Sequence, residues 1–100
     1  TRCKGFDNFG VFGPCIATGL EAKDLIIKTI INDSDIKQDY PVSDMMFSTD
    51  EIVMYLSQNM TLHAGDVICV GTSLGLGPME KGSKVTVDIE SIGSLTNTYG

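Results

Sequence analysis

The sequence predicts a mostly β fold that contains one short helix, and three observations support this prediction. Residues 24–32 form an apolar, β-branched run that is typical of a strand. Residues 84–90 alternate between apolar and polar side chains, as a half-buried strand does. Between these two segments, a helix-start signal at Ser48 precedes apolar residues at helical spacing, which predicts a helix over residues 49–59.

The first part of the chain predicts little regular structure. Residues 1–13 are rich in glycine and phenylalanine, which favours an ordered loop packed by its aromatic rings. Residues 15–18 are predicted to form a short strand, and residues 21–24 have the polar composition of a turn.

Residues 24–32 and the segment that follows them predict a β-hairpin. The first strand carries isoleucine and leucine on both faces, so both faces are expected to be at least partly buried. Residues 32–35 have turn composition, and residues 36–40 are expected to return as the second strand. Pro41 ends that strand, because proline cannot donate a hydrogen bond to a ladder.

The predicted helix has a specific start signal. Ser48 is expected to cap the helix, and Glu51 lies three residues later, as a capping box requires. Apolar side chains then recur about once a turn: Ile52, Leu56 and Met60. The helix therefore has one face for packing.

The second half of the chain predicts three further features. Residues 63–66 form a turn, and residues 67–70 form a short buried strand in which Cys69 belongs to the core. Gly93 ends the alternating strand, and residues 94–99 are expected to form the last strand.

Length and composition limit the classes of protein. The 100 residues suggest a single domain over 1–100, and a 42% hydrophobic content predicts a real core. A domain this small buries a modest share of its surface, so it is expected to depend on a partner. The net charge of −6 and the scattered basic residues argue against nucleic acid as that partner.

Membrane insertion and disulfide bonding are not expected. No apolar run approaches the roughly 20 residues that span a bilayer, so no membrane partner is predicted. The three cysteines are an odd number without C-x-x-C spacing, which favours reduced thiols and a cytoplasmic protein.

The loop over residues 71–77 is the first candidate for chemistry. Its glycines would let backbone N–H groups approach a small anionic substrate, or they would simply form a connecting turn. A phosphate-binding loop is not supported, because Pro78 follows where a helix would begin and no Gly-Lys-Ser/Thr is present.

Other polar residues have competing interpretations. Lys4 is either a clamp for a substrate carboxylate or a solvated surface lysine. Asp88 and Glu90 lie on the same side of a strand and could share a cation, but the solvent face of an amphipathic strand is the favoured explanation, since Lys84 and Thr86 continue the same polar series. His63 is expected to be an exposed turn histidine.

Several stretches, in this order and spacing, together resemble the C-terminal part of the fumarylacetoacetate hydrolase family. They include Lys4-Gly5-Phe6-Asp7, Gln38-Asp39, Ser43-Asp44-Met45-Met46-Phe47, Tyr55-Leu56-Ser57-Gln58, Gly71-Thr72 and Ile92-Gly93-Ser94-Leu95. No single stretch is specific, but the set covers nearly all of the chain.

The resemblance implies a mixed β-roll, often dimeric, in an enzyme that acts on small 2-oxo or 1,3-dicarbonyl acids with Mg²⁺ or Mn²⁺. The implied reactions are C–C hydrolysis, decarboxylation and keto–enol isomerisation. Lys4 matches the active-site lysine, and Gly71 with Thr72 match the substrate-binding strand end. Asn8 stands where some members have a threonine close to the metal.

The resemblance also implies that the metal ligands, a Glu-x-Glu pair and an aspartate, precede the Lys-x-Phe segment. We therefore expect no metal ligand within residues 1–100. These residues would then be part of a larger enzyme, or a free-standing half with little activity alone. The alternatives are a non-catalytic oligomerising β module, forming a homo-oligomer, and a small-anion binding module that uses the loop from Gly71 to Gly77.

Overall fold

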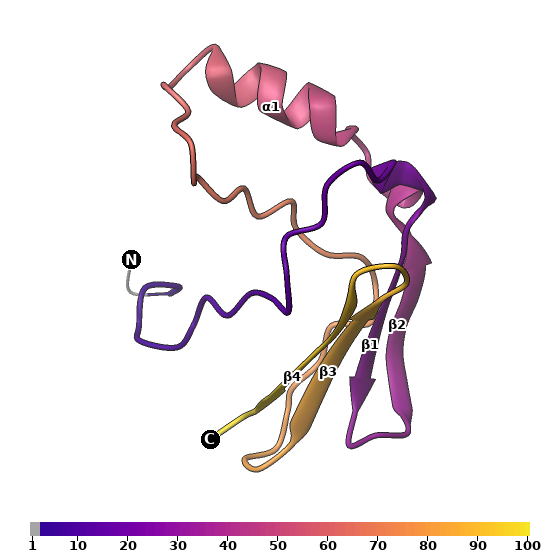
Figure 1. The fold of residues 1–100 in the computed structure, drawn as a ribbon. Helices are drawn as coiled ribbons and strands as arrows, with labels where there is room; N and C mark the ends of the chain where they lie inside the picture. The colour runs from indigo at the N-terminus through magenta and orange to yellow at the C-terminus, as the bar shows by residue number, and fades with distance from the viewer. Residues whose placement is uncertain (1–2) are drawn as a thin grey trace.

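A computed structural model describes residues 3–100 as a four-stranded antiparallel sheet with one α-helix set apart from it (Figure 1). In chain order the elements are η1 (Ala22–Asp24), β1 (Ile26–Ile31), β2 (Asp35–Pro41), η2 (Val42–Asp44), α1 (Thr49–Ser57), β3 (Lys84–Ile89) and β4 (Gly93–Thr98). The mostly β prediction is confirmed, and so is the helix, which ends at Ser57 rather than at residue 59.

The strand order in the sheet is β2-β1-β3-β4, and every neighbouring pair is antiparallel. β1 lies between β2 and β3, which agrees with its apolar side chains on both faces. β2 is an edge strand and ends at Pro41, where a missing N–H costs nothing. The predicted hairpin and the two C-terminal strands are therefore confirmed.

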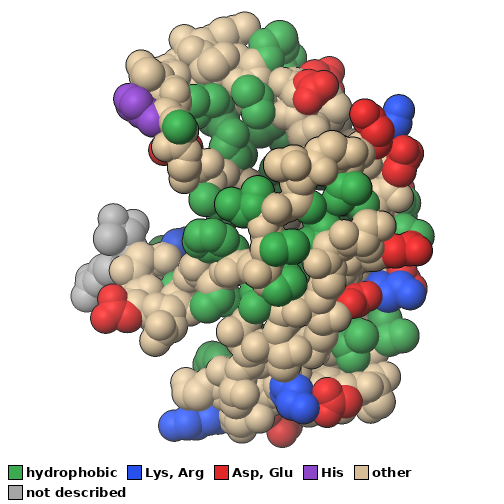
Figure 2. All heavy atoms as spheres, in the orientation of Figure 1, with side chains coloured by type: hydrophobic (Ala, Val, Ile, Leu, Met, Phe, Trp, Pro, Cys, Tyr) green, Lys and Arg blue, Asp and Glu red, His purple; other side chains and the backbone are tan. Residues whose placement is uncertain are grey.

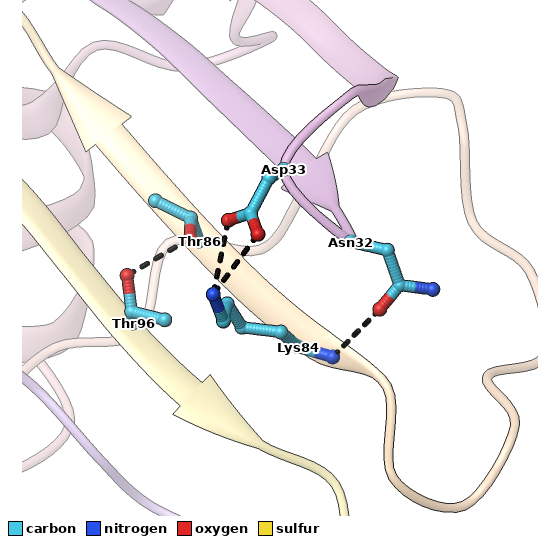
Figure 3. Close-up of polar contacts among 5 residues, drawn as sticks. All are labelled: Asn32, Asp33, Lys84, Thr86 and Thr96. Carbon is cyan, nitrogen blue, oxygen red and sulfur yellow. Dashed lines mark hydrogen bonds and ion pairs between the residues drawn. The ribbon is translucent and has the colours of Figure 1, made fainter.

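The turn between β1 and β2 is tied to the start of β3 by polar contacts (Figure 3). Asn32 and Asp33 have φ values of 50° and 66°, a region that these residue types tolerate better than most. The Lys84 backbone N–H donates to Asn32 Oδ1 at 3.0 Å, and Lys84 Nζ lies 2.9 Å from Asp33 Oδ2. The hydroxyls of Thr86 and Thr96 share a 2.8 Å hydrogen bond between β3 and β4.

Helix α1 begins with the predicted capping box. Ser48 Oγ accepts from the Glu51 N–H at 3.3 Å, and Glu51 Oε2 accepts from the Ser48 N–H at 2.8 Å. The pKa of Glu51 lies below its ordinary value, because the backbone N–H and then the hydroxyl of Ser48 donate to the charged carboxylate.

Two of the predicted strands are wrong. Residues 15–18 and 67–70 are irregular, and Ile16 and Val67 are 87% and 63% exposed. Cys69, expected in the core, is also exposed. A β-branched run becomes a strand only where another strand pairs with its backbone, and within residues 3–100 neither segment has such a partner.

The expected core is not present within residues 3–100. None of the hydrophobic side chains in that range is buried, and the only buried residue there is Ser83. The radius of gyration is 14.7 Å, against about 13 Å for a compact domain of this length. Figure 2 shows hydrophobic side chains gathered in the hollowed region between the top of the molecule, where α1 lies, and the sheet.

The loop near the N-terminus packs only locally. The Phe6 and Phe9 rings contact each other with centroids 5.3 Å apart, as the aromatic-rich composition predicts, yet both are about 60% exposed. Within residues 3–100, no helix combines the length and the apolar character that crossing a membrane requires.

Candidate functional site

A cavity of about 300 Å³ lies where the sheet, the segment after β2, α1 and the 71–77 loop meet. Its lining residues are Ile27, Tyr40, Val42, Asp44, Met45, Met46, Phe47, Ile52, Val70, Gly71, Thr72 and Ser73. The volume is at the lower end of the range for small-molecule sites, and most of the lining is apolar. The cavity therefore suits a small ligand.

Each wall of the cavity follows from local structure. Ile27 of β1 and Tyr40 of β2 are direct cross-strand partners, so their side chains lie side by side on one face of the sheet. Ile52 contributes from α1, on the apolar stripe that the helical spacing predicts. Asp44 is the one charged residue in the lining, so the described residues give the cavity no positive charge.

Thr72 is held in place by the side chain of Gln38 on β2. Gln38 Nε2 donates to Thr72 Oγ1 at 2.8 Å, and it also lies 3.1 Å from the Ser73 carbonyl oxygen and 3.0 Å from that of Leu74. Gln38 Oε1 accepts from the Thr29 hydroxyl of β1 at 2.8 Å. A chain of hydrogen bonds therefore connects the interior of the sheet to the cavity wall.

Gly75 lets the 71–77 loop lie directly on β2. Its φ is +99°, and a Cβ at this position would collide with the Lys37 carbonyl oxygen. Close backbone contact of this kind requires glycine. The glycine at position 75 is thus explained by its packing against β2.

The backbone N–H groups of residues 71–77 are free of protein acceptors within residues 3–100. Three of these residues, Gly71, Thr72 and Ser73, also line the cavity. Unpaired N–H groups beside a cavity are suited to bind a carboxylate or carbonyl oxygen.

The predicted residues Lys4 and Asn8 are not brought to this cavity. Both lie in the exposed loop that precedes the sheet, and neither is among the lining residues. Asn8 has a φ of 65°, which asparagine tolerates in a turn. The structure thus places Gly71 and Thr72 at the cavity, but neither Lys4 nor Asn8.

Of the remaining acidic and histidine candidates, Asp88 and His63 have structural partners. Asp88 accepts a hydrogen bond from the Ser94 hydroxyl across β3 and β4. His63 lies in the predicted turn, where its backbone N–H donates to Asp66 Oδ2 at 2.7 Å. Within the part of the chain that the structure describes, no three His, Cys, Asp or Glu side chains gather closely enough to hold a metal ion. These residues therefore do not fit Mg²⁺ or Mn²⁺.

Sequence reasoning did not identify Gln38 as a site residue. A glutamine on an edge strand has an ordinary solvent-facing explanation, and its partners in the loop lie 34 to 36 residues further along the chain. One signal was present: Gln38 belongs to one of the stretches that carry the family resemblance.

The fold and the cavity define an antiparallel β unit with a site for a small ligand. Residues 1–99 match the family model described as Fumarylacetoacetate (FAA) hydrolase C-terminal. The chain therefore belongs to the fumarylacetoacetate hydrolase family, and the resemblance found in the sequence is confirmed.

Three relatives of known sequence illustrate the match. Protein Rv2993c of Mycobacterium tuberculosis is 44% identical over 97% of this chain and 37% of its own length. The 4-hydroxyphenylacetate degradation bifunctional isomerase/decarboxylase of Salmonella dublin is 33% identical over 96% of this chain and 23% of its own. Oxaloacetate tautomerase YisK of Bacillus subtilis is 37% identical over 80% of this chain and 29% of its own.

Two solved structures share the fold. The 2-hydroxyhepta-2,4-diene-1,7-dioate isomerase from Mycobacterium marinum has a TM-score of 0.92 at 43% identity, over 98% of this chain and 38% of that one. Maleylpyruvate hydrolase from Sphingobium sp. SYK-6, in complex with manganese (II) ion and pyruvate, has a TM-score of 0.80 at 29% identity, over 86% of this chain and 33% of that one. This chain thus spans well under half of the length of these relatives.

Proposed function

We propose that this chain supplies the substrate-binding wall of an enzyme that acts on a small 2-oxo or 1,3-dicarbonyl acid. The reaction would be C–C hydrolysis, decarboxylation or keto–enol isomerisation. The observation that carries the proposal is the cavity of about 300 Å³ in which Gly71 and Thr72 lie beside unpaired backbone N–H groups. The activities of the relatives, which are isomerase, decarboxylase, tautomerase and hydrolase, support the same class.

The role proposed for Gly71 and Thr72 is to hold oxygen atoms of the acid. The Thr72 hydroxyl and the N–H groups of residues 71–73 are donors, and carboxylate and carbonyl oxygens are acceptors. The apolar lining would accommodate the carbon chain of the substrate and limit the access of water. Donors held in place before the substrate arrives stabilise charge on oxygen without rearrangement.

Lys4 is proposed as the catalytic lysine on the basis of the family match alone. Its ammonium would neutralise the acid's negative charge, which the described lining does not do, since Asp44 is its one charged residue. Asn8 is proposed to lie near the metal for the same reason. Both assignments require the loop before the sheet to approach the cavity in the complete enzyme.

Mg²⁺ or Mn²⁺ is proposed as the cofactor because a relative binds manganese together with pyruvate. When bound, such an ion would polarise the carbonyl oxygen of the substrate. The acids of residues 3–100 do not form its ligand set, so we assign no step of the reaction through the metal to this chain. We also propose a cytoplasmic protein, because Cys3, Cys15 and Cys69 are free.

The test is turnover of oxaloacetate and of an acylpyruvate with Mg²⁺ by the full-length protein and its Thr72→Val variant. The variant keeps the shape of the side chain and removes the donor, so we expect a loss of roughly 10- to 100-fold in kcat/KM. Thr61→Val is the matched control, because Thr61 is exposed and lies away from the cavity lining. Equal activity of all three proteins would contradict the proposed role of Thr72.

A second proposal is self-association into a homo-oligomer. The observation in its favour is that, across residues 3–100, no hydrophobic side chain is buried, while Ile16, Met46 and Leu74 are each 87% to 89% exposed. Exposed apolar surface of this extent is typical of protein interfaces. Sedimentation velocity is expected to show a dimer or larger species, and a clean monomer at high concentration would contradict this proposal.

Binding without turnover would instead favour the small-anion module. Calorimetry with oxalate or pyruvate, with and without Mg²⁺, measures binding of the anion, and the oxaloacetate assay measures turnover. An enzyme is expected to give both signals, whereas a binding module binds the anion and does not convert oxaloacetate. In either case the loop from Gly71 to Gly77 is the proposed anion site.

A further inference from the structure

We infer that Gln38 is a positioning residue that makes the Thr72 hydroxyl a hydrogen-bond donor toward the ligand. The inference rests on the proposed function, because it specifies how Thr72 would meet a substrate oxygen. It comes from the hydrogen bonds that Gln38 makes with the 72–74 segment and with β1.

The partners of Gln38 determine which way its side-chain amide points. The carbonyl oxygens of Ser73 and Leu74 can only accept, and both lie within 3.1 Å of Nε2. A flipped amide would place Oε1 against these two oxygens and leave three acceptors facing one another. The amide nitrogen therefore faces the loop, and Oε1 faces the Thr29 hydroxyl, which donates to it at 2.8 Å.

This orientation determines the polarity of Thr72. Its Oγ1 accepts from Gln38 Nε2 at 2.8 Å, so the hydroxyl proton cannot point toward Gln38. Within residues 3–100, no protein atom accepts that proton. Because Thr72 lines the cavity, the proton is available to an oxygen of a bound ligand.

A ligand oxygen that only accepts is therefore the matching partner. Carboxylate and ketone oxygens meet this requirement. An amine or a hydroxyl that must donate is less suited, because Thr72 Oγ1 already accepts from Gln38. The direction of one hydroxyl proton would thus favour oxygens that only accept, and this preference would add to the charge neutralisation proposed for Lys4.

The experiment measures pyruvate affinity by calorimetry with Mg²⁺ present, in the full-length protein and four variants. Thr72→Val is expected to weaken binding about 10- to 100-fold, because the hydrogen bond is made to a charged group. Gln38→Met, which removes the amide at nearly constant volume, is expected to weaken binding about 5- to 10-fold. Gln58→Met, at an exposed position after α1, is the matched control and is expected to have no effect.

The double variant Gln38→Met with Thr72→Val distinguishes positioning from a general structural effect. If Gln38 acts through Thr72, adding Gln38→Met to Thr72→Val changes pyruvate affinity by less than about 2-fold. Equal effects of Gln38→Met in both backgrounds would overturn the inference, since Gln38 would then act independently of Thr72.

A spectroscopic measurement on the unaltered protein covers the case in which a variant does not fold. The side-chain amide signals of Gln38 are expected to shift when pyruvate is added, while those of Gln58 stay in place. Unmoved Gln38 signals at saturating pyruvate would overturn the inference. If pyruvate binds and Thr72→Val has no effect, the proposed role of Thr72 itself fails, whereas a loss in Thr72→Val without a loss in Gln38→Met contradicts only the inference about Gln38.

Discussion

Gly75 and Gly77 show that two glycines of one loop can have different physical roles. Gly75 has a φ of +99° and lies against the Lys37 carbonyl oxygen, whereas Gly77 has open space around it. The spacing of glycines in the sequence does not distinguish these cases. Only the contact with β2 identifies Gly75 as the position where a side chain cannot be accommodated.

Gly75→Ala is expected to destabilise the protein by about 1–3 kcal/mol, because it combines an unfavourable φ with a steric clash against backbone. Gly77→Ala is the control and should change stability by no more than about 0.5 kcal/mol. Urea unfolding of the full-length protein measures both. Equal stabilities of the two variants would show that the loop does not pack on β2 as described.

Asn32 and Lys84 provide a comparison between a neutral and a charged contact. Asn32→Ala removes the acceptor of the Lys84 N–H and leaves alanine at a φ of 50°, so a loss of about 1–2 kcal/mol is expected. Lys84→Met removes only an exposed ion pair with Asp33 and is expected to cost less than about 1 kcal/mol. Thermal unfolding of both variants tests this ranking, and a larger loss for Lys84→Met would reverse it.

At the level of elements, α1 was predictable because its signals are local. Ser48 and Glu51 satisfy each other's backbone N–H groups within a single turn, so no distant partner is needed. The strands differ in this respect. Other strands pair with residues 26–31 and 84–89 in the sheet. Within residues 3–100, no strand pairs with the similarly β-branched residues 67–70, which are irregular.

The capping box makes a prediction about acidity. Ser48→Ala removes the hydroxyl donor but keeps the backbone N–H, which is the larger cause of the lowered pKa of Glu51. The pKa of Glu51 is therefore expected to rise only part of the way toward its ordinary value of 4.5. A carbon-detected NMR titration of the carboxyl group measures the change, and a pKa that stays the same would contradict the hydroxyl contact.

The sign of the stability change with pH follows from the same shift. Because the folded-state pKa of Glu51 is lowered, its stabilising contribution is fully present above the ordinary value of 4.5 and is lost as the pH falls through the lowered value. Glu51→Gln does not titrate and should lack this component. Unfolding of the full-length protein at a series of acidic pH values compares the two. A parallel loss of stability in both proteins would mean that Glu51 contributes nothing to acid sensitivity.

At the level of the whole molecule, the exposed apolar surface is the main departure from expectation. A hydrophobic content of 42% predicts a core, but across residues 3–100 no hydrophobic side chain is buried. Figure 1 gives the geometric reason: the sheet is a single layer, and α1 lies beyond one end of it rather than over its face. A single layer exposes both of its faces unless another layer covers them.

The 100-residue chain alone is expected to show little or no turnover of oxaloacetate with Mg²⁺. Within residues 3–100 no metal-ligand cluster forms, and Lys4 does not line the cavity with Thr72. The measurement is the rate of oxaloacetate decarboxylation with the chain and with the full-length protein at equal concentration. Clear Mg²⁺-dependent activity of the chain alone would show that a metal site exists among residues that we have assigned other roles.

Only part of the cavity lining was named from the sequence. Gly71 and Thr72 were proposed from the strand-end loop and the family resemblance, and both line the cavity, but their binding role remains a prediction. Gln38 was not identified as a site residue, because its partners in the loop are more than 30 positions away in the chain. The proposed roles of Lys4 and Asn8 remain predictions, since neither residue lies at the cavity.

The sequence alone was sufficient for the features that depend on near neighbours: the strand periodicities, the turn at Asn32, the capping box at Ser48 and the family to which the chain belongs. The tertiary structure decided which β-branched runs became strands, which glycine carried a steric constraint and which side chain oriented Thr72. The physical reason is that backbone pairing, close packing and the direction of a hydroxyl proton all depend on atoms supplied by distant parts of the chain.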